Sequence, residues 1–298
     1  MKSIVSMGNF DGLHLGHRKL IQTMVELARE QSLKSVVITF KQHPALVLNG
    51  AHNFRLLIPC EHKIRMIKEM GVDEIVCLPF TKELSQLSAL DFLQSYVVDE
   101  LDPGIIVVGY DSHFGHGREG NYQFLQEHAA SFGYRCLYVP ALEDEEGIIS
   151  SSRIRALLLE GRIDEANRLL GSPYSMYGEV VKGKGLGKGL GFPTANLALD
   201  EPRQLVPRAG VYISKVFLGE DVFFGLTNIG TAPSVKQDRK TTVETHMPEY
   251  NADLYGARMK LELLHFMRPE LCFASRTELI KAMQADLAQA KTLFEEYA

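Results

Sequence analysis

GNFDGLHLGH, residues 8–17, decides the fold class of the first half of the chain. An apolar run at residues 4–7, typical of a buried strand, precedes it, and a run with helical spacing at residues 20–27 follows it. The stretch therefore lies at a strand-to-helix turn. Its three glycines let the backbone turn sharply and approach a ligand, and the first helical turn offers unpaired N–H groups to a phosphate. We expect an anion-binding site at this turn.

His14 and His17 stand three residues apart in this stretch, so both imidazoles can point at the same anion. Donors so placed stabilise the charge that builds on phosphate oxygens when the phosphorus is attacked in line. Two other interpretations are solvent-facing histidines on a glycine-rich turn and a metal-binding pair. A zinc site needs a third and a fourth ligand, and no nearby cluster of Cys or His supplies them. The anion site is the favoured interpretation.

A second informative stretch is KGLGFPTAN, residues 188–196, which continues a run rich in glycine and lysine that begins at residue 182. So many glycines, with a proline among them, exclude a regular helix. The run is typical of a loop whose N–H groups and lysines surround a polyphosphate, and no GKS or GKT follows to make it a Walker site. Thr194 and Asn196 add hard oxygen atoms of the kind that Mg²⁺ prefers. The alternative is a flexible linker, which seldom contains a Phe-Pro-Thr-Ala-Asn run between strand-like segments.

Strand-like runs alternate with helical stretches in the first half, which predicts an α/β domain with a parallel, Rossmann-like sheet. Ligands of such sheets lie beyond the carboxyl ends of the strands, where His14 and Asp111 both fall. The predicted strands are residues 3–7, 35–40, 74–78, 104–109 and 135–139.

The chain changes character near Pro173, which predicts a first domain of residues 1–172 and a second of residues 173–298. The second domain consists mostly of short strands and turns, typical of a small antiparallel β-barrel. Apolar positions spaced along residues 276–298, with charges between them, predict an amphipathic terminal helix that packs on the barrel.

Composition narrows the class of protein. The 298 residues carry a formal net charge of -5, which argues against a general nucleic-acid binder. The four cysteines form no CxxC pair and are typical of reduced thiols in a cytoplasmic protein. The start shows no signal peptide, and no run approaches the ~20 apolar residues that a membrane span needs. We therefore expect a cytoplasmic enzyme with no membrane partner, and the sequence leaves its oligomeric state open.

The first stretch resembles the HxGH signature of nucleotidyltransferases. Its longer FDGxHxGH form is similar to the N-terminal half of the prokaryotic bifunctional riboflavin kinase/FMN adenylyltransferases, the FAD synthetases. Further segments of that family follow in the same order, so the resemblance covers nearly the whole chain. They are residues 107–120 with VVGYDSHFG, residues 149–155 with ISSSRIR, residues 191–196 with GFPTAN and residues 243–246 with VETH.

The resemblance implies a two-step enzyme that makes FMN from riboflavin and ATP in the second domain, and FAD and pyrophosphate from FMN and ATP in the first. Both steps would require Mg²⁺. Glu244 would be the general base that accepts the proton of the ribityl hydroxyl; on residue type alone it is a solvent-facing strand carboxylate. The other implied roles are catalysis by His14, His17 and Asp111; ATP or phosphate binding by Gly8, Phe10, Gly16, Ser151, Ser152, Arg155, Gly183, Lys184, Gly187, Lys188 and Gly191; flavin binding by Asp11, Phe114 and Arg268; and metal binding by Thr194 and Asn196.

The chain also departs from the family pattern. Ser112 replaces an aromatic residue and His113 a residue that is often basic, while Lys188 and Ala232 stand where the family usually has arginine. Two alternatives therefore accompany the bifunctional hypothesis: a riboflavin kinase whose first domain has decayed, and a first domain that senses flavin as a regulatory or nucleic-acid-binding module. The histidine pair and the two residues Asp111 and Arg155 favour catalysis over the regulatory module. Apart from the resemblance, Ser151 and Ser152 are simple caps of a helix start.

Overall fold

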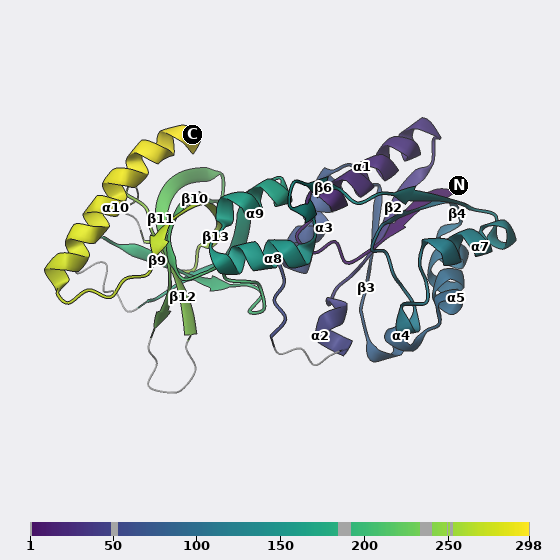
Figure 1. Ribbon diagram of the computed structural model, residues 1–298, viewed down its shortest axis with the longest axis horizontal. Coiled ribbons are helices and arrows are strands. Elements are labelled where there is room, and N and C mark those ends of the chain that lie inside the picture. The colour runs from purple at the N-terminus through teal and green to yellow at the C-terminus, as the bar shows by residue number, and fades with distance from the viewer. Residues whose placement is uncertain are drawn as a thin grey trace. The chain divides into compact units, whose positions relative to one another are not determined.

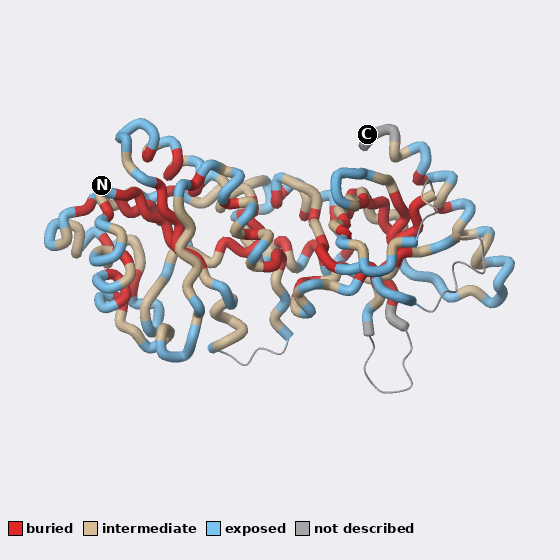
Figure 2. Tube along the Cα trace, turned by 180° about the vertical axis from the view of Figure 1, so that it is seen from behind, coloured by how far each residue is buried: buried red, intermediate tan, exposed pale blue. Residues whose placement is uncertain are grey.

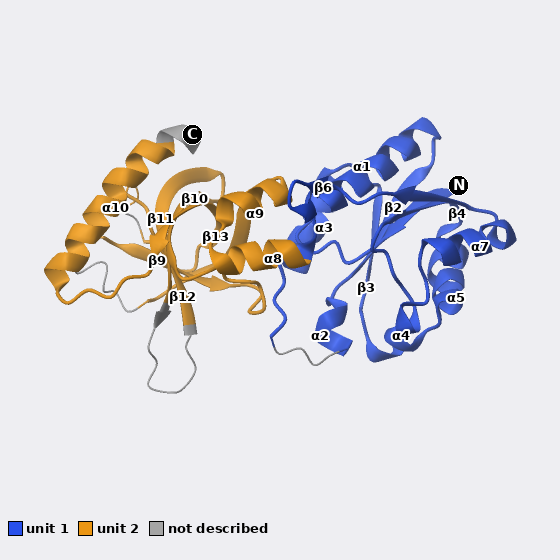
Figure 3. Cartoon of the chain, in the orientation of Figure 1, with its two compact units in different colours: residues 1–151 blue, residues 152–298 orange. Residues whose placement is uncertain are grey.

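The computed structural model describes residues 2–48, 53–183, 192–232, 240–248, 250 and 253–297 (Figure 1). The chain divides into two compact units, residues 1–151 and residues 152–298 (Figure 3). Residues 184–191 of the predicted phosphate loop lie outside the described residues, and with them four predicted phosphate-binding residues, namely Lys184, Gly187, Lys188 and Gly191.

The first unit is built on a parallel sheet of five strands with the order β3-β2-β1-β4-β5. Each strand begins and ends within one residue of the run predicted for it, so the parallel α/β fold is confirmed. The strands are β1 Ser3–Met7, β2 Lys34–Phe40, β3 Glu74–Leu78, β4 Pro103–Gly109 and β5 Arg135–Val139.

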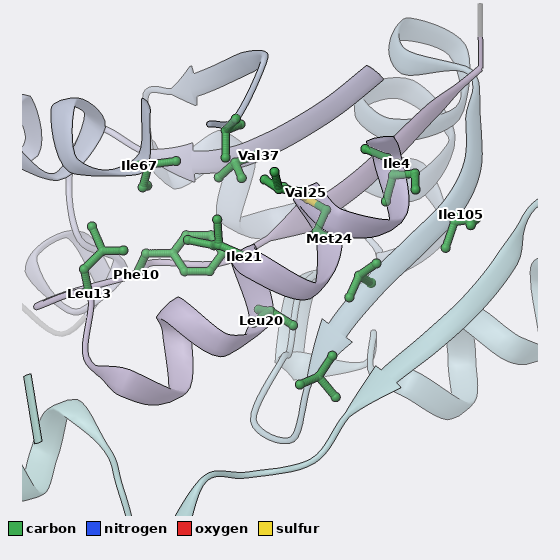
Figure 4. Close-up of a cluster of buried hydrophobic side chains, with 14 residues drawn as sticks. Ile4, Phe10, Leu13, Leu20, Ile21, Met24, Val25, Val37, Ile67 and Ile105 are labelled. Atoms are coloured by element: carbon green, nitrogen blue, oxygen red, sulfur yellow. The ribbon is translucent and has the colours of Figure 1, made fainter. Parts of the chain in front are cut away.

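Both faces of this sheet are covered, because successive side chains of a strand point to opposite faces. On β1, Ile4 belongs to one buried cluster and Val5 to another. Figure 2 shows the buried segments following the strands. Helix α1 (Leu15–Glu30) covers the first face, and Figure 4 shows its buried residues packed with Phe10 and Leu13 of the turn before it. The buried positions of α1 are 20, 21, 24, 25 and 28, the spacing of one apolar helix face.

Shorter elements connect the strands of the first unit. Apart from α3 and α7, each of them is six residues or shorter. They are α2 Pro44–Leu48, α3 Cys60–Glu69, α4 Lys82–Gln86, α5 Ala89–Phe92, the π-helical turn η1 Leu93–Val98, α6 Asp99–Leu101, the 3-10 turn η2 His116–Arg118, α7 Tyr122–Phe132, β6 Glu143–Asp144 and β7 Gly147–Ile148.

The second unit is a closed antiparallel barrel with the strand order β10-β11-β12-β9-β8-β13. Helix α10 (Arg276–Tyr297) packs on it: Ala290 is fully buried, and the rings of Phe224 and Phe294 stack with centroids 4.9 Å apart. The predicted small barrel with a terminal helix is confirmed. Its strands are β8 Tyr174–Val181, β9 Thr194–Leu199, β10 Gly210–Leu218, β11 Asp221–Ala232, β12 Lys240–His246 and β13 Arg258–Pro269.

Helices α8 (Ser151–Glu160) and α9 (Ile163–Leu170) lie at the division between the units. Helix α9 packs on the barrel: Asn167 Nδ2 donates to the carbonyl of Leu263 at 2.8 Å, and its Oδ1 accepts the N–H of Tyr174 at 2.7 Å. Residues 152–172 thus belong to the second compact unit. The boundary near Pro173 between two domains, predicted from the sequence, stays a prediction.

Across the described residues, no helix has both the length and the apolar character needed to cross a membrane.

Candidate active sites

The first candidate site lies where the strand order reverses. Strand β1 has β2 on one side and β4 on the other, so the loops that follow β1 and β4 leave the sheet in opposite directions. Doubly wound sheets bind their ligands in the crevice at this point. A pocket opens there, and the structure brings three predicted catalytic residues into it. Its lining includes His14, Gly16 and His17 of the first turn, Tyr110 and Asp111 after β4, and residues 139–142 after β5.

His14 is the N-cap of α1. Its backbone is extended, with φ -63° and ψ 169°, and its Nδ1 accepts the backbone N–H of His17 at 3.4 Å. The backbone N–H of Arg18 donates to the carbonyl of His14 at 2.9 Å. Because Nδ1 is an acceptor, the neutral ring carries its proton on Nε2. His14 therefore offers an Nε2–H donor at the positive end of the helix dipole.

The two histidine rings are stacked, with centroids 3.7 Å apart and planes 18° apart. Gly16 makes this possible: a Cβ there would stand 3.2 Å from Cε1 and Nδ1 of His14. The glycine between the histidines thus lets the first ring fold back against the first turn of the helix. Sequence alone indicated a flexible position, and the structure gives it a steric reason.

His17 is neutral near pH 7. Burial lowers the pKa of His17 well below its usual range, and the charges of His14 and Lys63 lower it further. Its Nδ1 is buried and has no hydrogen-bond partner among the described residues, which is costly unless a ligand supplies one. The ring edge of His17 also contacts Phe10, with centroids 5.4 Å apart. The pair is therefore suited to hold an oxyanion through N–H donors.

Asp111 is exposed at the rim of the same pocket. Ser112 closes the turn beside it, because its Oγ accepts the backbone N–H of Gly109 at 2.9 Å. Burial raises the pKa of Tyr110, and the negative charge of Asp111 adds to the effect. Ser112, a departure from the family pattern, thus has a local structural role in holding the loop.

Asp11 binds main chain. Its side chain is only 4% exposed, and its carboxylate accepts the N–H of Leu57 at 3.0 and 3.2 Å and that of Ile58 at 3.3 Å. Its carbonyl accepts the hydroxyl of Ser151 at 2.8 Å. Asp11 also lines a second pocket, together with Asn9 and Lys63. Its predicted contact with flavin stays a prediction, and its observed role is to fasten two segments to the first turn.

Lys63 is a residue that the sequence analysis missed. It is 6% exposed, and its ammonium donates to the carbonyl of Asn9 at 2.9 Å, Thr39 Oγ1 at 2.9 Å and the carbonyl of Phe40 at 3.1 Å. Burial lowers the pKa of Lys63. The residue ties the turn after β1 to the end of β2. A signal was present, because Lys63 stands four positions before the buried Ile67 and so lies on the buried face of α3.

The two aromatic residues with predicted binding roles lie in buried clusters. Phe10, with φ +50°, is 1% exposed and packs under α1, so only its backbone can meet a phosphate. A Cβ at Gly8 would stand 3.1 Å from its ring. Phe114 packs against Phe92 and Phe124 on the other face of the sheet, with centroids 5.7 and 5.8 Å away. Phe114 does not line the pocket that holds His14.

The serine and arginine residues of the third segment begin α8. Ser151 closes the first unit through its bond to the carbonyl of Asp11. Ser152 and Arg155 follow on α8 in the second unit. Their predicted contacts with the triphosphate of ATP stay predictions.

The second candidate site lies on the barrel, between β9 and β12. Glu244 pairs with Asn196 and His246 with Thr194 in the antiparallel ladder, which puts all four side chains on one face. Thr194 Oγ1 donates to Glu244 Oε2 at 3.4 Å, and Thr194, Asn196 and Glu244 are each half-buried. The structure thus brings the predicted general base and both predicted metal ligands together.

Two contacts shape the approach to this site. A Cβ at Gly183, two residues after the end of β8, would stand 2.3 to 2.6 Å from the side-chain amide of Asn196, so a larger residue there would force this amide to move. His246 Nδ1 lies 2.9 Å from the carbonyl of Pro193, and the ring of Phe192 meets that of His246 edge-on at 5.3 Å. These contacts fix the start of β9 and with it the orientation of Thr194.

The donor atoms of this site fit Mg²⁺. A hydroxyl, an amide oxygen and a carboxylate are hard oxygen ligands, and partial exposure leaves space for the waters that this ion keeps. A closed zinc-like centre is a different matter: within the part of the chain that the structure describes, no three His, Cys, Asp or Glu side chains gather around one position.

Arg268, predicted to bind flavin, forms a bidentate ion pair. Its Nε and Nη2 donate to Asp286 Oδ1 at 2.9 Å and Oδ2 at 2.6 Å, which ties β13 to α10. Asp286 is 8% exposed, so the pair is largely shielded from water. A flavin contact of Arg268 stays a prediction, and its observed partner is the terminal helix.

Comparison with known proteins finds relatives over both units. The FAD synthetase family matches residues 1–153, and the riboflavin kinase family matches residues 170–294. A bifunctional riboflavin kinase/FMN adenylyltransferase of Buchnera aphidicola subsp. Schizaphis graminum is 34% identical over 98% of this chain and 94% of the relative. One from Escherichia coli K12 is 35% identical over 98% of this chain and 92% of the relative. The chain belongs to the bifunctional riboflavin kinase/FMN adenylyltransferase family.

The family match assigns each candidate site to one of its two domains. The histidine pocket lies within the residues matched by the FAD synthetase family, and Glu244 lies within those matched by the riboflavin kinase family. A crystal structure from Streptococcus pneumoniae, described as a macrolide-efflux protein, is 32% identical, covers 97% of this chain and 94% of its own, and has a TM-score of 0.89. This member of the bifunctional family therefore shares its fold over both units with a solved structure.

Proposed function

We propose that the chain phosphorylates riboflavin to FMN in its second unit, and adenylylates FMN to FAD with release of pyrophosphate in its first, using ATP for both steps. The observation that carries the proposal is the stacked pair of His14 and His17, which shares one pocket with Asp111 at the switch point of the sheet. Family membership supplies the two activities. The four free cysteines support a reducing, cytoplasmic location.

In the first unit, a phosphate oxygen of FMN would attack the α-phosphorus of ATP, and pyrophosphate would leave. The attacking phosphate is already an anion, so the site needs no strong base. His14 Nε2–H and the neutral ring of His17 would donate to the non-bridging oxygens as charge builds there, beside the positive end of α1. One such donor contributes roughly 3 kcal/mol to the stability of a transition state.

In the second unit, Glu244 would accept the proton of the ribityl hydroxyl as its oxygen attacks the γ-phosphorus of ATP, and ADP would leave. The hydroxyl of Thr194 contacts Glu244 Oε2, which leaves Oε1 to take the proton. Mg²⁺, when bound, would offset the charge of the transferring phosphates. Thr194 and Asn196 are the residues that would hold it.

The proposal is tested by incubating the purified chain with riboflavin, ATP and Mg²⁺ and separating the flavins by chromatography. We expect FMN to appear first and FAD to follow. In the His14→Ala and His17→Ala variants, FAD formation should fall about 10²-fold, because each loses a donor to the α-phosphate. FMN formation in these variants should keep the wild-type rate, which serves as the internal control for folding.

Other outcomes point elsewhere. A wild-type chain that accumulates FMN without FAD would reduce the function to riboflavin kinase alone. A double variant lacking both histidines that makes FAD as fast as wild type would remove His14 and His17 from the reaction. Riboflavin left unchanged by the wild type would overturn the kinase assignment.

A further inference from the structure

Two cysteines with no part in the reactions above lie side by side in the first unit. Cys60 is the first residue of α3, and Cys77 lies on β3 beside Thr39 of β2. Their sulfur atoms are 3.7 Å apart, and both residues are half-buried. Sixteen intervening residues separate them in the sequence, so the fold rather than the local chain brings the thiols together.

Cys60 also lines the second pocket of this unit. Cys60 lines that pocket together with Asn9, Asp11 and Lys63, and its sulfur lies 3.8 Å from the carbonyl of Phe40. Cys60 therefore belongs to the wall of a pocket that is open to small solutes. The other two cysteines differ: Cys136 is half-buried on β5 and Cys272 is exposed in the second unit.

We propose that Cys60 and Cys77 are a modification site, which closes to an intramolecular disulfide under peroxide and thereby slows the chemistry of the histidine pocket. One thiolate attacks a peroxide oxygen, the O–O bond breaks, and a sulfenic acid and water form. The second sulfur then attacks the sulfenic sulfur, the S–O bond breaks, and a second water leaves. Two thiols lose two electrons and two protons in total, and one hydrogen peroxide becomes two waters.

The bond requires a small movement of known direction. A disulfide has a sulfur–sulfur distance of about 2.05 Å, so the 3.7 Å separation must shorten by about 1.7 Å. The movement draws the first turn of α3 and the edge strand β3 together. Since β2 separates β3 from β1, the turn of α3 moves away from the segment that follows β1.

Lys63 links this movement to the histidine pocket. It follows Cys60 by three residues, on the same side of α3, and it donates to the carbonyl of Asn9 in the turn that carries His14. A movement of the first turn of α3 therefore strains the hydrogen bond from Lys63 to Asn9, which holds the His14 turn in place. Displacing reacting groups by about 1 Å costs up to roughly 10²-fold in rate. This consequence rests on the proposed function, whereas the disulfide itself does not.

The surroundings of the pair slow its reaction with peroxide near neutral pH. The pKa of Cys60 is raised to about 11, mainly by burial; the charge of Lys63 opposes the rise, and Cys77 and Glu61 contribute to it. Thiolate is the attacking form, so the disulfide should form slowly near neutral pH and faster as pH rises. Cys136 is a matched control, because burial also raises the pKa of Cys136 to about 11 but no second thiol lies beside it.

The test uses the full chain and three variants, Cys60→Ser, Cys77→Ser and the double variant Cys136→Ser with Cys272→Ser. Each is reduced, treated with hydrogen peroxide, alkylated, digested and analysed by mass spectrometry. We expect a linked Cys60–Cys77 peptide in the wild type and in the double variant, and none in the single variants. Oxidation of Cys272 without any Cys60–Cys77 link would overturn the proposal, as would equal reactivity of Cys60 and Cys136.

The same samples give the effect on activity. With FMN and ATP supplied, peroxide treatment should slow FAD formation by the wild type ~10- to 100-fold. A thiol reductant should restore the rate. The Cys77→Ser variant should form FAD at the same rate with and without peroxide treatment. If the linked peptide forms but FAD formation does not slow, the proposed effect on the histidine pocket is wrong, whereas the disulfide between Cys60 and Cys77 stands. Untreated wild type that makes no FAD would instead contradict the proposed function, and the peptide analysis would still decide the disulfide.

Discussion

His17 makes the stability of the first unit depend on pH. In the unfolded chain a histidine has a pKa of about 6.5, whereas burial holds the folded value well below it. Between these two values the unfolded state binds a proton that the folded state does not. The free energy of unfolding therefore has its full value above the pKa of His17 in the unfolded chain. It decreases as pH falls toward the pKa of His17 in the folded chain, by up to about 1.4 kcal/mol per pH unit.

The prediction is checked by urea unfolding, followed by circular dichroism, of wild type and His17→Gln from about pH 7.5 to 5. The free energy of unfolding of the wild type should fall more steeply with acidification than that of the variant, and the difference of the two slopes isolates His17 from the other histidines. Parallel slopes would show that His17 titrates normally in the folded chain.

At this scale the sequence predicted which residues meet, but not how they meet. The three-residue spacing of His14 and His17 indicated a shared ligand, and the structure places both in one pocket. Their stacking depends on the N-cap conformation of His14, which no spacing rule contains. The family resemblance implied that Asp11 binds flavin, and this stays a prediction. In the structure its carboxylate accepts two backbone N–H groups from residues more than forty positions away, a long-range pairing invisible in the sequence.

At the scale of elements, a substitution at Gly16 should change the geometry of the first turn of α1 without lowering the stability of the helix. Alanine is a better helix former than glycine by about 1 kcal/mol, so Gly16→Ala should leave the fold intact or stabilise it. The new Cβ would press on the ring of His14 from 3.2 Å and displace it. FAD formation should therefore fall although the free energy of unfolding does not.

Gly133→Ala is the matched control for that variant. Gly133 ends α7 with φ +72°, and a Cβ there would meet nothing within 4 Å. Alanine in this left-handed conformation costs about 1 kcal/mol of stability and should leave FAD formation unchanged. Rates of both variants with FMN and ATP, measured alongside their unfolding curves, give the comparison. If Gly16→Ala keeps the wild-type rate, the stacking of the histidines is not needed for the reaction.

The sequence predicted the elements that have a clear apolar pattern. It did not predict the short helices or which barrel strands pair with one another. The five parallel strands are short apolar runs, and their bounds were predicted within one residue. Residues 82–101 form a chain of short helices joined by a π-helical turn, each too short to show an apolar period. In the barrel, β8 pairs with β9 and β13, and this order depends on contacts across eighty residues. Pairing partners of antiparallel strands follow from packing, so the sequence predicted the barrel class without its strand order.

At the scale of the whole molecule, the proposed function links the two sites by a product that one would make and the other would use. Glu244 belongs to the barrel, and the histidine pocket belongs entirely to the first unit. The sequence predicted this division of labour from two motifs far apart in the chain. The predicted boundary near Pro173 follows the change from helical to strand-like sequence and stays a prediction; in the structure, α9 packs on the barrel.

The last prediction therefore concerns two variants mixed in one tube. Glu244→Gln should lower FMN formation from riboflavin by roughly 10²- to 10⁴-fold, the contribution of a general base, while FMN supplied directly is still converted to FAD at the wild-type rate. The variant with His14→Ala and His17→Ala should do the reverse and accumulate FMN. Neither alone makes FAD from riboflavin at an appreciable rate, but an equimolar mixture should, because FMN released by one chain diffuses to the other. If Glu244→Gln also fails with FMN, its effect reaches beyond the barrel; if the histidine variant stops after one FMN per chain and the mixture makes no FAD, FMN is not released between the two steps.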